Sequence, residues 1–162
     1  MKYADMILPE FEREMAKTRQ VLECVPEDKF QWQATPTSHT IGWNANHLAE
    51  IPGWVGGTLT MLAWDVAPAD GEAYQSPNFT TRAELLALFD QNVTAACEAI
   101  QAVREEDLGV AWSLLHAGNV LFTMPRRDVI RYFVLNHTIH HRAILCTYLR
   151  IHEVAVPAMY GV

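Results

Sequence analysis

Residues 126–150, RRDVIRYFVLNHTIHHRAILCTYLR, limit the fold of this chain more than any other stretch. Apolar side chains recur along them at helical spacing, which predicts one long helix, the last of the fold, with a single apolar face. His137 and His141 lie near the middle of that face. Because they are four residues apart, their rings project side by side from adjacent turns. Two neighbouring buried imidazoles need a polar partner: either a divalent metal ion binds both, or they are structural histidines.

Composition narrows the class of protein. With 162 residues, half of them hydrophobic and 19% charged, the chain is expected to form a single soluble domain over residues 1–162. The net charge of −7 argues against nucleic acid as a partner. No apolar run approaches the ~20 residues that span a membrane, and the acidic N-terminal segment does not resemble a signal peptide. Cys24, Cys97 and Cys146 are far apart, which fits reduced thiols in a cytoplasmic protein.

Three earlier helices are predicted from the same periodicity. The first spans residues 3–24 and ends before Pro26. The second, residues 38–64, is apolar over too broad a face for a surface helix, so it is expected to be central, and Pro52 predicts a kink or local break in it. The third covers residues 81–104.

The connecting segments complete the predicted fold. Residues 65–80 have the Pro, Gly, Asp and Ser content of a long loop. Residues 110–124 carry β-branched and aromatic side chains on both sides of Ala117-Gly118-Asn119, which predicts a β-hairpin. The apolar tail, residues 153–162, is expected to lie back on the helices. We therefore predict an all-α four-helix bundle with a long inter-helix loop and a short β-hairpin before the last helix.

A third metal ligand is expected on a second helix of the bundle. His47 is the best candidate, because Trp43, Ile51 and Trp54 place it on a buried helix face. Together with His137 and His141 it would bind Zn²⁺ or Ni²⁺ and leave positions open for water or substrate. The other histidines are better explained as edge, cap or surface residues: His140, His39, His116 and His152.

Three motifs give the chain a recognisable pattern. They are Ser38-His39-Thr40-Ile41-Gly42-Trp43 leading to His47-Leu48-Ala49-Glu50, then Asn136-His137-Thr138-Ile139-His140-His141-Arg142, and the closing Val156-Pro157-Ala158-Met159-Tyr160-Gly161. In these motifs the chain resembles the DinB-like (YfiT-like) superfamily of proposed metalloenzymes. The resemblance covers essentially the whole chain. It implies a four-helix bundle, a divalent-metal site formed by His47, His137 and His141, and often a homodimer.

The chain departs from that family at one point. Members often continue with His-Arg-Gly-Gln after the second histidine segment, whereas this chain has His141-Arg142-Ala143-Ile144. Any substrate contact that the glutamine makes in relatives is therefore missing here. The three histidines themselves are intact.

Several residues near the expected ligands have two interpretations each. Glu50 lies one turn beyond His47 and is our candidate for proton transfer; it could also accept a hydrogen bond from an imidazole, or be an ordinary solvated glutamate. Asn44 and Asn136 are candidates for holding the ligands. Four tryptophans are candidates for the wall of a substrate pocket or for plain core residues: Trp43, Trp54, Trp64 and Trp112. Tyr160 in the tail, and the long loop, are candidate covers of the site.

Three functions fit this pattern. Some members of the family that the chain resembles are transferases or isomerases that depend on low-molecular-weight thiols. The resemblance therefore favours transfer of such a thiol to a small electrophile. A metal-dependent hydrolase is the second, since metal ions also activate water. The third is a non-catalytic metal-binding protein of a stress response. The expected partners are a small-molecule substrate and a second copy of the chain.

Overall fold

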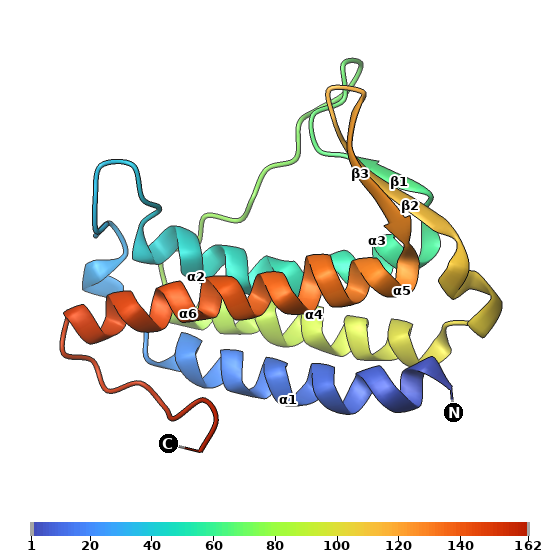
Figure 1. Ribbon diagram of the computed structural model, residues 1–162. Helices are drawn as coiled ribbons and strands as arrows, with labels where there is room; N and C mark the ends of the chain where they lie inside the picture. The colour runs from blue at the N-terminus through green and yellow to red at the C-terminus, as the bar shows by residue number, and fades with distance from the viewer. Residues whose placement is uncertain (1, 162) are drawn as a thin grey trace.

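Four helical rods form the body of the protein, and a small sheet lies at one end of it (Figure 1). The computed structural model describes residues 2–161. The rods are α1 (Tyr3–Glu23); α2 (Ile41–Glu50), which runs through the 3₁₀ turn η2 (Ile51–Gly53) into α3 (Trp54–Thr60); α4 (Arg82–Ala102); and α5 (Arg126–Val129), which runs through η4 (Ile130–Leu135) into α6 (Asn136–Ile151). Two short 3₁₀ turns, η1 (Glu27–Lys29) and η3 (Glu105–Gly109), lie in connections. The predicted four-helix fold is confirmed.

The rods pack in a ring, so that each has two neighbours. α1 contacts α4 and α6, and α2 contacts the same two helices from the other side. The side chains between them form one apolar core, in which Phe11, Ile41, Leu85 and Leu145 are almost completely buried. This arrangement sets α2 against α6, the two helices that carry the candidate ligands. No helix between residues 2 and 161 has both the length and the hydropathy needed to cross a membrane.

The second rod contains the predicted break but ends earlier than predicted. A 3₁₀ turn at Ile51–Gly53 interrupts it at Pro52, because proline lacks the N–H that an α-helical bond needs there. The prediction of helix up to Trp64 is wrong for its last residues. Ala63–Asp65 form a strand, β1, because their backbone pairs in parallel with residues 113–115. Two glycines in α3 weaken the helix, so long-range pairing wins over local periodicity.

The hairpin is confirmed and is part of a three-stranded sheet. β2 (Ala111–His116) and β3 (Asn119–Pro125) pair antiparallel, and the turn residues Ala117 and Gly118 both have positive φ, of 51° and 75°. β1 adds the third strand, in the order β1-β2-β3. The carboxylate of Asp65 accepts hydrogen bonds from the backbone N–H groups of Ala117 and Gly118. It thereby fastens the hairpin turn to β1, and those N–H groups together with that of Ala67 lower the pKa of Asp65.

The sequence predicted one uniform α-helix for the last rod, and this prediction is wrong in its first half. Ile130–Leu135 are π-helical, and the α-helix resumes at Asn136, one residue before His137. Single π-helical turns inside α-helices are frequent at functional sites. Nothing in the apolar periodicity of this stretch signals the change, because the apolar residues remain buried on both sides of it.

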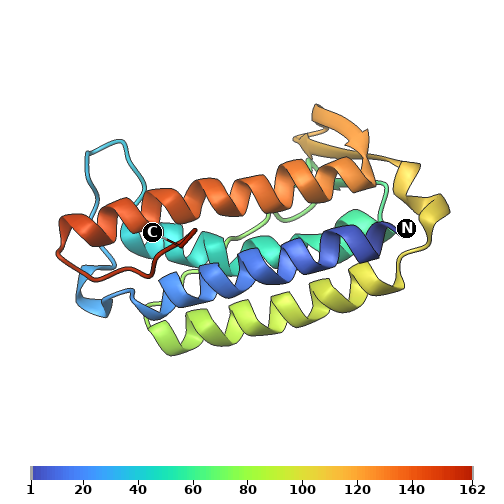
Figure 2. The ribbon, with the colours of Figure 1, turned by 60° about the horizontal axis from the view of Figure 1, so that its bottom comes forward.

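Residues 153–161 of the tail lie back on the bundle, as predicted (Figure 2), and Val162 lies outside the described residues. The phenol of Tyr160 lies 3.0 Å from the guanidinium of Arg142, and the carbonyl of Ala158 accepts a hydrogen bond from Lys17. Arg142 is only 2% exposed and pairs with the carboxylate of Glu14 in α1 at 2.5 Å. The residue that follows His141 in the motif is thus a buried tie between α6, α1 and the tail.

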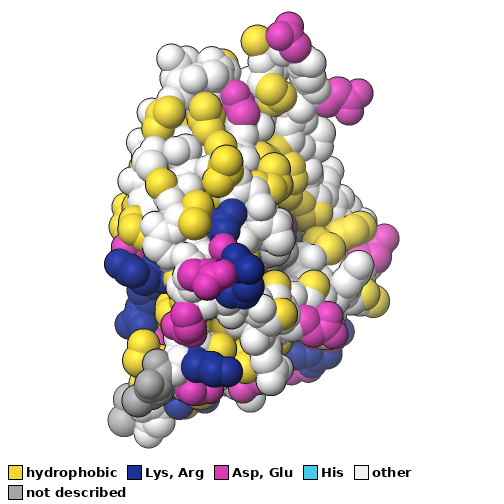
Figure 3. Space-filling view, turned by 90° about the vertical axis from the view of Figure 1, so that its right-hand side faces the viewer, with side chains coloured by type: hydrophobic (Ala, Val, Ile, Leu, Met, Phe, Trp, Pro, Cys, Tyr) yellow, Lys and Arg dark blue, Asp and Glu magenta, His cyan; other side chains and the backbone are white. Residues whose placement is uncertain are grey.

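Exposed apolar side chains gather at the sheet end of the molecule. Seen from that end, hydrophobic side chains lie mainly over the upper and middle part of the surface, and most lysine and arginine side chains lie over the lower part (Figure 3). Leu62, Val120, Leu121 and Tyr132 are each more than half exposed. Leu62 precedes β1, Val120 and Leu121 are in β3, and Tyr132 is in η4, where its ring packs edge-on against Phe122 of β3.

The close contact between Gly42 and Phe30 makes a test of the packing around α2. A Cβ at residue 42 would lie 2.9 Å from the carbonyl oxygen of Phe30 and 3.2 Å from its Cβ, so Gly42→Ala should lower the free energy of unfolding by about 1–3 kcal/mol. Gly56→Ala is the control, since a Cβ there meets no atom within 4 Å and should stabilise α3 by roughly 0.5–1 kcal/mol. Urea unfolding of both variants measures the difference. Equal stabilities would show that the two positions are equally open.

Candidate metal centre

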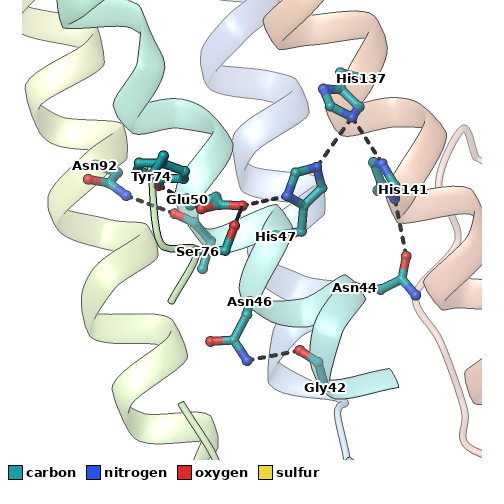
Figure 4. A network of polar contacts seen from close by, with 11 residues as sticks. Gly42, Asn44, Asn46, His47, Glu50, Tyr74, Ser76, Asn92, His137 and His141 are labelled. Carbon is teal, nitrogen blue, oxygen red and sulfur yellow. Dashed lines mark hydrogen bonds and ion pairs between the residues drawn. The ribbon is translucent and has the colours of Figure 1, made fainter. Parts of the chain in front are cut away.

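Three histidines from two neighbouring helices bring their Nε2 atoms together. His47 lies on α2, and His137 and His141 lie on successive turns of α6 (Figure 4). The Nε2 of His137 is 3.3 Å from that of His47 and 3.0 Å from that of His141. Among residues 2–161, this is the group of histidine, cysteine or carboxylate side chains that could hold a metal ion, and all its ligand atoms lie within 4.8 Å of one another.

These separations fit a shared metal ion. Two imidazole nitrogens bound to one Zn²⁺ at 2.0–2.1 Å with tetrahedral angles are about 3.3 Å apart. An octahedral ion brings adjacent ligands slightly closer, to about 2.9 Å at the same bond length. The distances of 3.0 and 3.3 Å fall in this range. The convergence expected from the i, i+4 spacing and from the position of His47 is therefore present.

The tautomers of two rings follow from the groups behind them. The Nδ1 of His47 lies 2.5 Å from Oε1 of Glu50, and the Nδ1 of His141 lies 3.1 Å from Oδ1 of Asn44. The amide of Asn44 is oriented by its own hydrogen bond, in which Nδ2 donates to the carbonyl of Thr40 at 2.9 Å. Both partners accept, so each Nδ1 carries the proton and each Nε2 presents a lone pair to the centre.

The third ring completes the set as a neutral base. Burial, followed by the charge of His47, lowers the pKa of His137 to about 4 and that of His141 to about 3. Both imidazoles are therefore neutral at physiological pH, the form in which histidine binds metals. The Nδ1 of His137 is buried and has no hydrogen-bond partner among residues 2–161. One proton on His137 Nε2 can satisfy only one of the two facing lone pairs, whereas a metal ion accepts all three.

Glu50 lies behind His47 and is almost fully buried, at 4% exposure. Its Oε1 also accepts a hydrogen bond from Ser76 at 3.2 Å, and its Oε2 accepts one from the phenol of Tyr74 at 2.7 Å. Burial and the neighbouring carboxylate raise the pKa of Tyr74, which keeps its proton. The loop predicted for residues 65–80 is thus joined to a metal-ligand candidate through one carboxylate. Sequence reasoning missed Tyr74 and Ser76, because an irregular loop has no periodicity that would show where they point.

Aromatic rings enclose the cluster. Trp43 stacks on His47 with ring centres 4.5 Å apart, and His39 stacks on the outer face of Trp43. Trp54 lies 5.5 Å from the rings of both His47 and His137 and stacks on Phe133. Phe133 is in the π-helical turn, and its apolar periodicity alone does not distinguish it from a core residue.

The remaining candidates lie farther from the centre. The ring of His140 is 4.9 Å from that of His141 but is not part of the metal-ligand group. Asn136 is exposed. Tyr160, a candidate cover, contacts Arg142 on the α1 side of α6 instead. Trp64 and Trp112 line a cavity of about 550 Å³; Glu50 and Trp54 also belong to its lining, and the three histidines do not.

Comparison with known proteins agrees with the resemblance. A model of the DinB superfamily matches residues 10–145. The crystal structure of a DinB-like protein from Bacillus cereus superposes with a TM-score of 0.69 at 21% identity, over 94% of this chain and 95% of that one. A DinB-like protein from Bacillus subtilis gives 0.67 at 15% identity, over 94% and 96%. At 21% and 15% identity, these two similarities support the fold of this chain and carry no conclusion about its function. No curated protein matches the sequence significantly.

The converging Nε2 atoms predict about one divalent ion per chain in protein purified without chelator. Because each ring supplies one ligand atom, His47→Ala, His137→Ala or His141→Ala should each remove most of the bound metal. His140→Ala is the matched control and should keep it. Elemental analysis of the purified variants by mass spectrometry gives the metal content. Full occupancy in the His47→Ala protein would contradict this ligand set.

Proposed function

The chain belongs to the DinB superfamily, and three of its imidazoles direct their Nε2 atoms toward one point. We propose that it is a metal-dependent enzyme that joins a small thiol to an electrophile. The convergence of His47, His137 and His141 is the observation that carries the proposal. The metal would be Zn²⁺ or Ni²⁺, since neutral imidazoles suit these ions. With three protein ligands, such an ion keeps at least one position for a fourth.

The neighbouring residues support this chemistry. When bound, the ion would lower the pKa of a coordinated thiol or water and so supply a nucleophile at neutral pH. His137 and His141 are neutral, so they leave its positive charge undiminished. The rings of Trp43, Trp54 and Phe133 pack against the histidine rings and keep bulk water away from them. Low water content strengthens every charge interaction at such a centre.

The reaction needs few groups from the protein. The thiol gives its proton to solvent or to a nearby base, and its sulfur forms a bond to an electron-poor carbon. The bond to the leaving group breaks at the same time, and the leaving group departs with the electron pair. Binding both reactants side by side is then the main task, because orientation removes much of the barrier to a two-molecule reaction.

Turnover of a model pair tests the proposal. With a neutral aryl halide and a panel of small thiols, the metal-loaded protein should form the thioether roughly 100-fold faster than the metal-free protein or His141→Ala, because a metal ion supplies several kcal/mol of charge stabilisation. His140→Ala should match the wild type. Equal rates in all forms would leave a metal-binding protein without this catalysis. Cleavage of an ester or amide that requires the metal but no thiol would make it a hydrolase.

We further propose that Glu50 acts through His47. Both of its oxygens already accept hydrogen bonds, from His47 and Ser76 on one side and from Tyr74 on the other, so both are engaged within the protein. A carboxylate behind a metal-bound imidazole fixes the ring and raises its basicity. The alternative from the sequence, proton transfer by Glu50, remains open to the same test.

Glu50→Gln separates the two roles. If Glu50 positions His47, the variant should bind metal about 10–100-fold more weakly and recover kcat and its pH profile at saturating metal. Ser76→Ala is the control, because it removes a hydrogen bond to the same oxygen without touching the imidazole. If kcat instead stays low at saturating metal and one limb of the pH–rate profile disappears, Glu50 transfers the proton.

A further inference from the structure

We propose that the cavity beside Glu50 and Trp54 binds a neutral, largely aromatic small molecule. The cavity measures about 550 Å³, which is within the range of sites for drug-sized ligands. The inference rests on the proposed function only for the role of this molecule, which would be the electrophile. The binding itself is argued from the walls of the cavity.

The position of the cavity connects it with the metal centre. Trp54 and Glu50 form part of its lining, while none of the three histidines does. Trp54 also contacts the rings of His47 and His137, and Glu50 holds the Nδ1 of His47. These two side chains therefore border both the cavity and the ligand cluster. A molecule in the cavity lies next to the centre without displacing a ligand.

The chemistry of the walls favours a flat apolar occupant. Three tryptophans line the cavity, and the ring of Trp64 lies 6.0 Å from that of Trp54 and meets Tyr74 edge-on at 4.9 Å. Aromatic rings bury large areas and prefer other rings in offset or edge-on contact. Phe79 and Leu88 add apolar surface from the loop and from α4. A compact aromatic molecule would match this lining better than a flexible polar one.

Charge excludes the ionic alternatives. No lysine, arginine or histidine is among the residues that line the cavity, so an anion would be buried without a counter-charge. Glu50 is the charged residue of the lining, and its oxygens are already engaged by His47, Ser76 and Tyr74. An organic cation would have to break these contacts to pair with it. A neutral molecule meets neither cost.

Three naphthalene probes of similar size test the charge preference. Calorimetric titration should show saturable binding of neutral 2-acetylnaphthalene, with a Kd at least tenfold lower than those of anionic 2-naphthoate and of a cationic 2-naphthyl trimethylammonium. The titration is made on both metal-loaded and metal-free protein, so that it does not depend on turnover. Tightest binding of either charged probe, or no binding of the neutral one, would overturn the proposal.

Two adjacent glycines of α3 allow the cavity to be filled selectively. Gly57 lines it, and a Cβ there would meet only the sulfur of Met61, at 3.6 Å, so Gly57→Leu should project into the space and weaken binding of 2-acetylnaphthalene at least tenfold. Gly56→Leu is the matched control, because a Cβ there meets nothing within 4 Å and Gly56 is not part of the lining. Unchanged affinity in a folded Gly57→Leu protein would place the probe elsewhere and overturn the site.

A second variant serves if Gly57→Leu does not fold. Trp64→Ala removes one aromatic ring from the lining, so it should weaken binding of 2-acetylnaphthalene about tenfold. Unchanged affinity in the folded Trp64→Ala protein would place the probe elsewhere and overturn the site. If the probe binds but no thioether forms, the proposed function is wrong and this inference stands. If thioether formation is unaffected by filling the cavity with Gly57→Leu, this inference is wrong and the proposed function stands.

Discussion

The mutual approach of three imidazole nitrogens is the constraint on which the rest of this structure depends. The Nε2 atom of His137 is 3.3 Å from that of His47 and 3.0 Å from that of His141. Nitrogen lone pairs that face one another at such distances repel unless a proton or a cation lies between them. The protein builds the arrangement from both sides. Glu50 and Asn44 accept hydrogen bonds from the Nδ1–H groups of His47 and His141, which leaves the Nε2 lone pairs directed inward, and the packing of α2 on α6 holds the rings at that distance. The fold therefore favours an ion at this point.

The helices and the histidine cluster could be predicted from the sequence because both depend on short spacings. Apolar periodicity placed the rods to within a few residues, and the i, i+4 pair on one helix with a buried histidine on another was enough to select His47, His137 and His141. The three-residue strand β1 could not be read, since it exists only through its pairing with residues 113–115. The homodimer expected from the resemblance stays a prediction.

The partners of the cluster escaped prediction for a related reason. Tyr74 and Ser76 reach Glu50 across more than twenty residues of irregular chain, and no local pattern reports such a contact. Arg142 was readable only as part of a motif. Its buried guanidinium contacts Glu14, Thr18 and Tyr160, so its place after His141 is explained by the tie between α6 and α1. One residue of a motif can thus stabilise the fold while its neighbour belongs to the candidate metal site.

The π-helical turn before His137 has a consequence for how this chain can change in length. An α-helix advances by about 100° per residue, so an added or deleted residue turns everything that follows it by that angle. The turn at Ile130–Leu135 takes up one more residue than an α-helical turn does, and it stands between the sheet end of the rod and the two histidines of α6. Losing that residue would restore a regular helix yet swing both imidazoles about 100° away from α2. The π-helical turn therefore sets the rotation of α6 about its axis relative to α5. The number of residues in this turn is thus constrained as strongly as their identity.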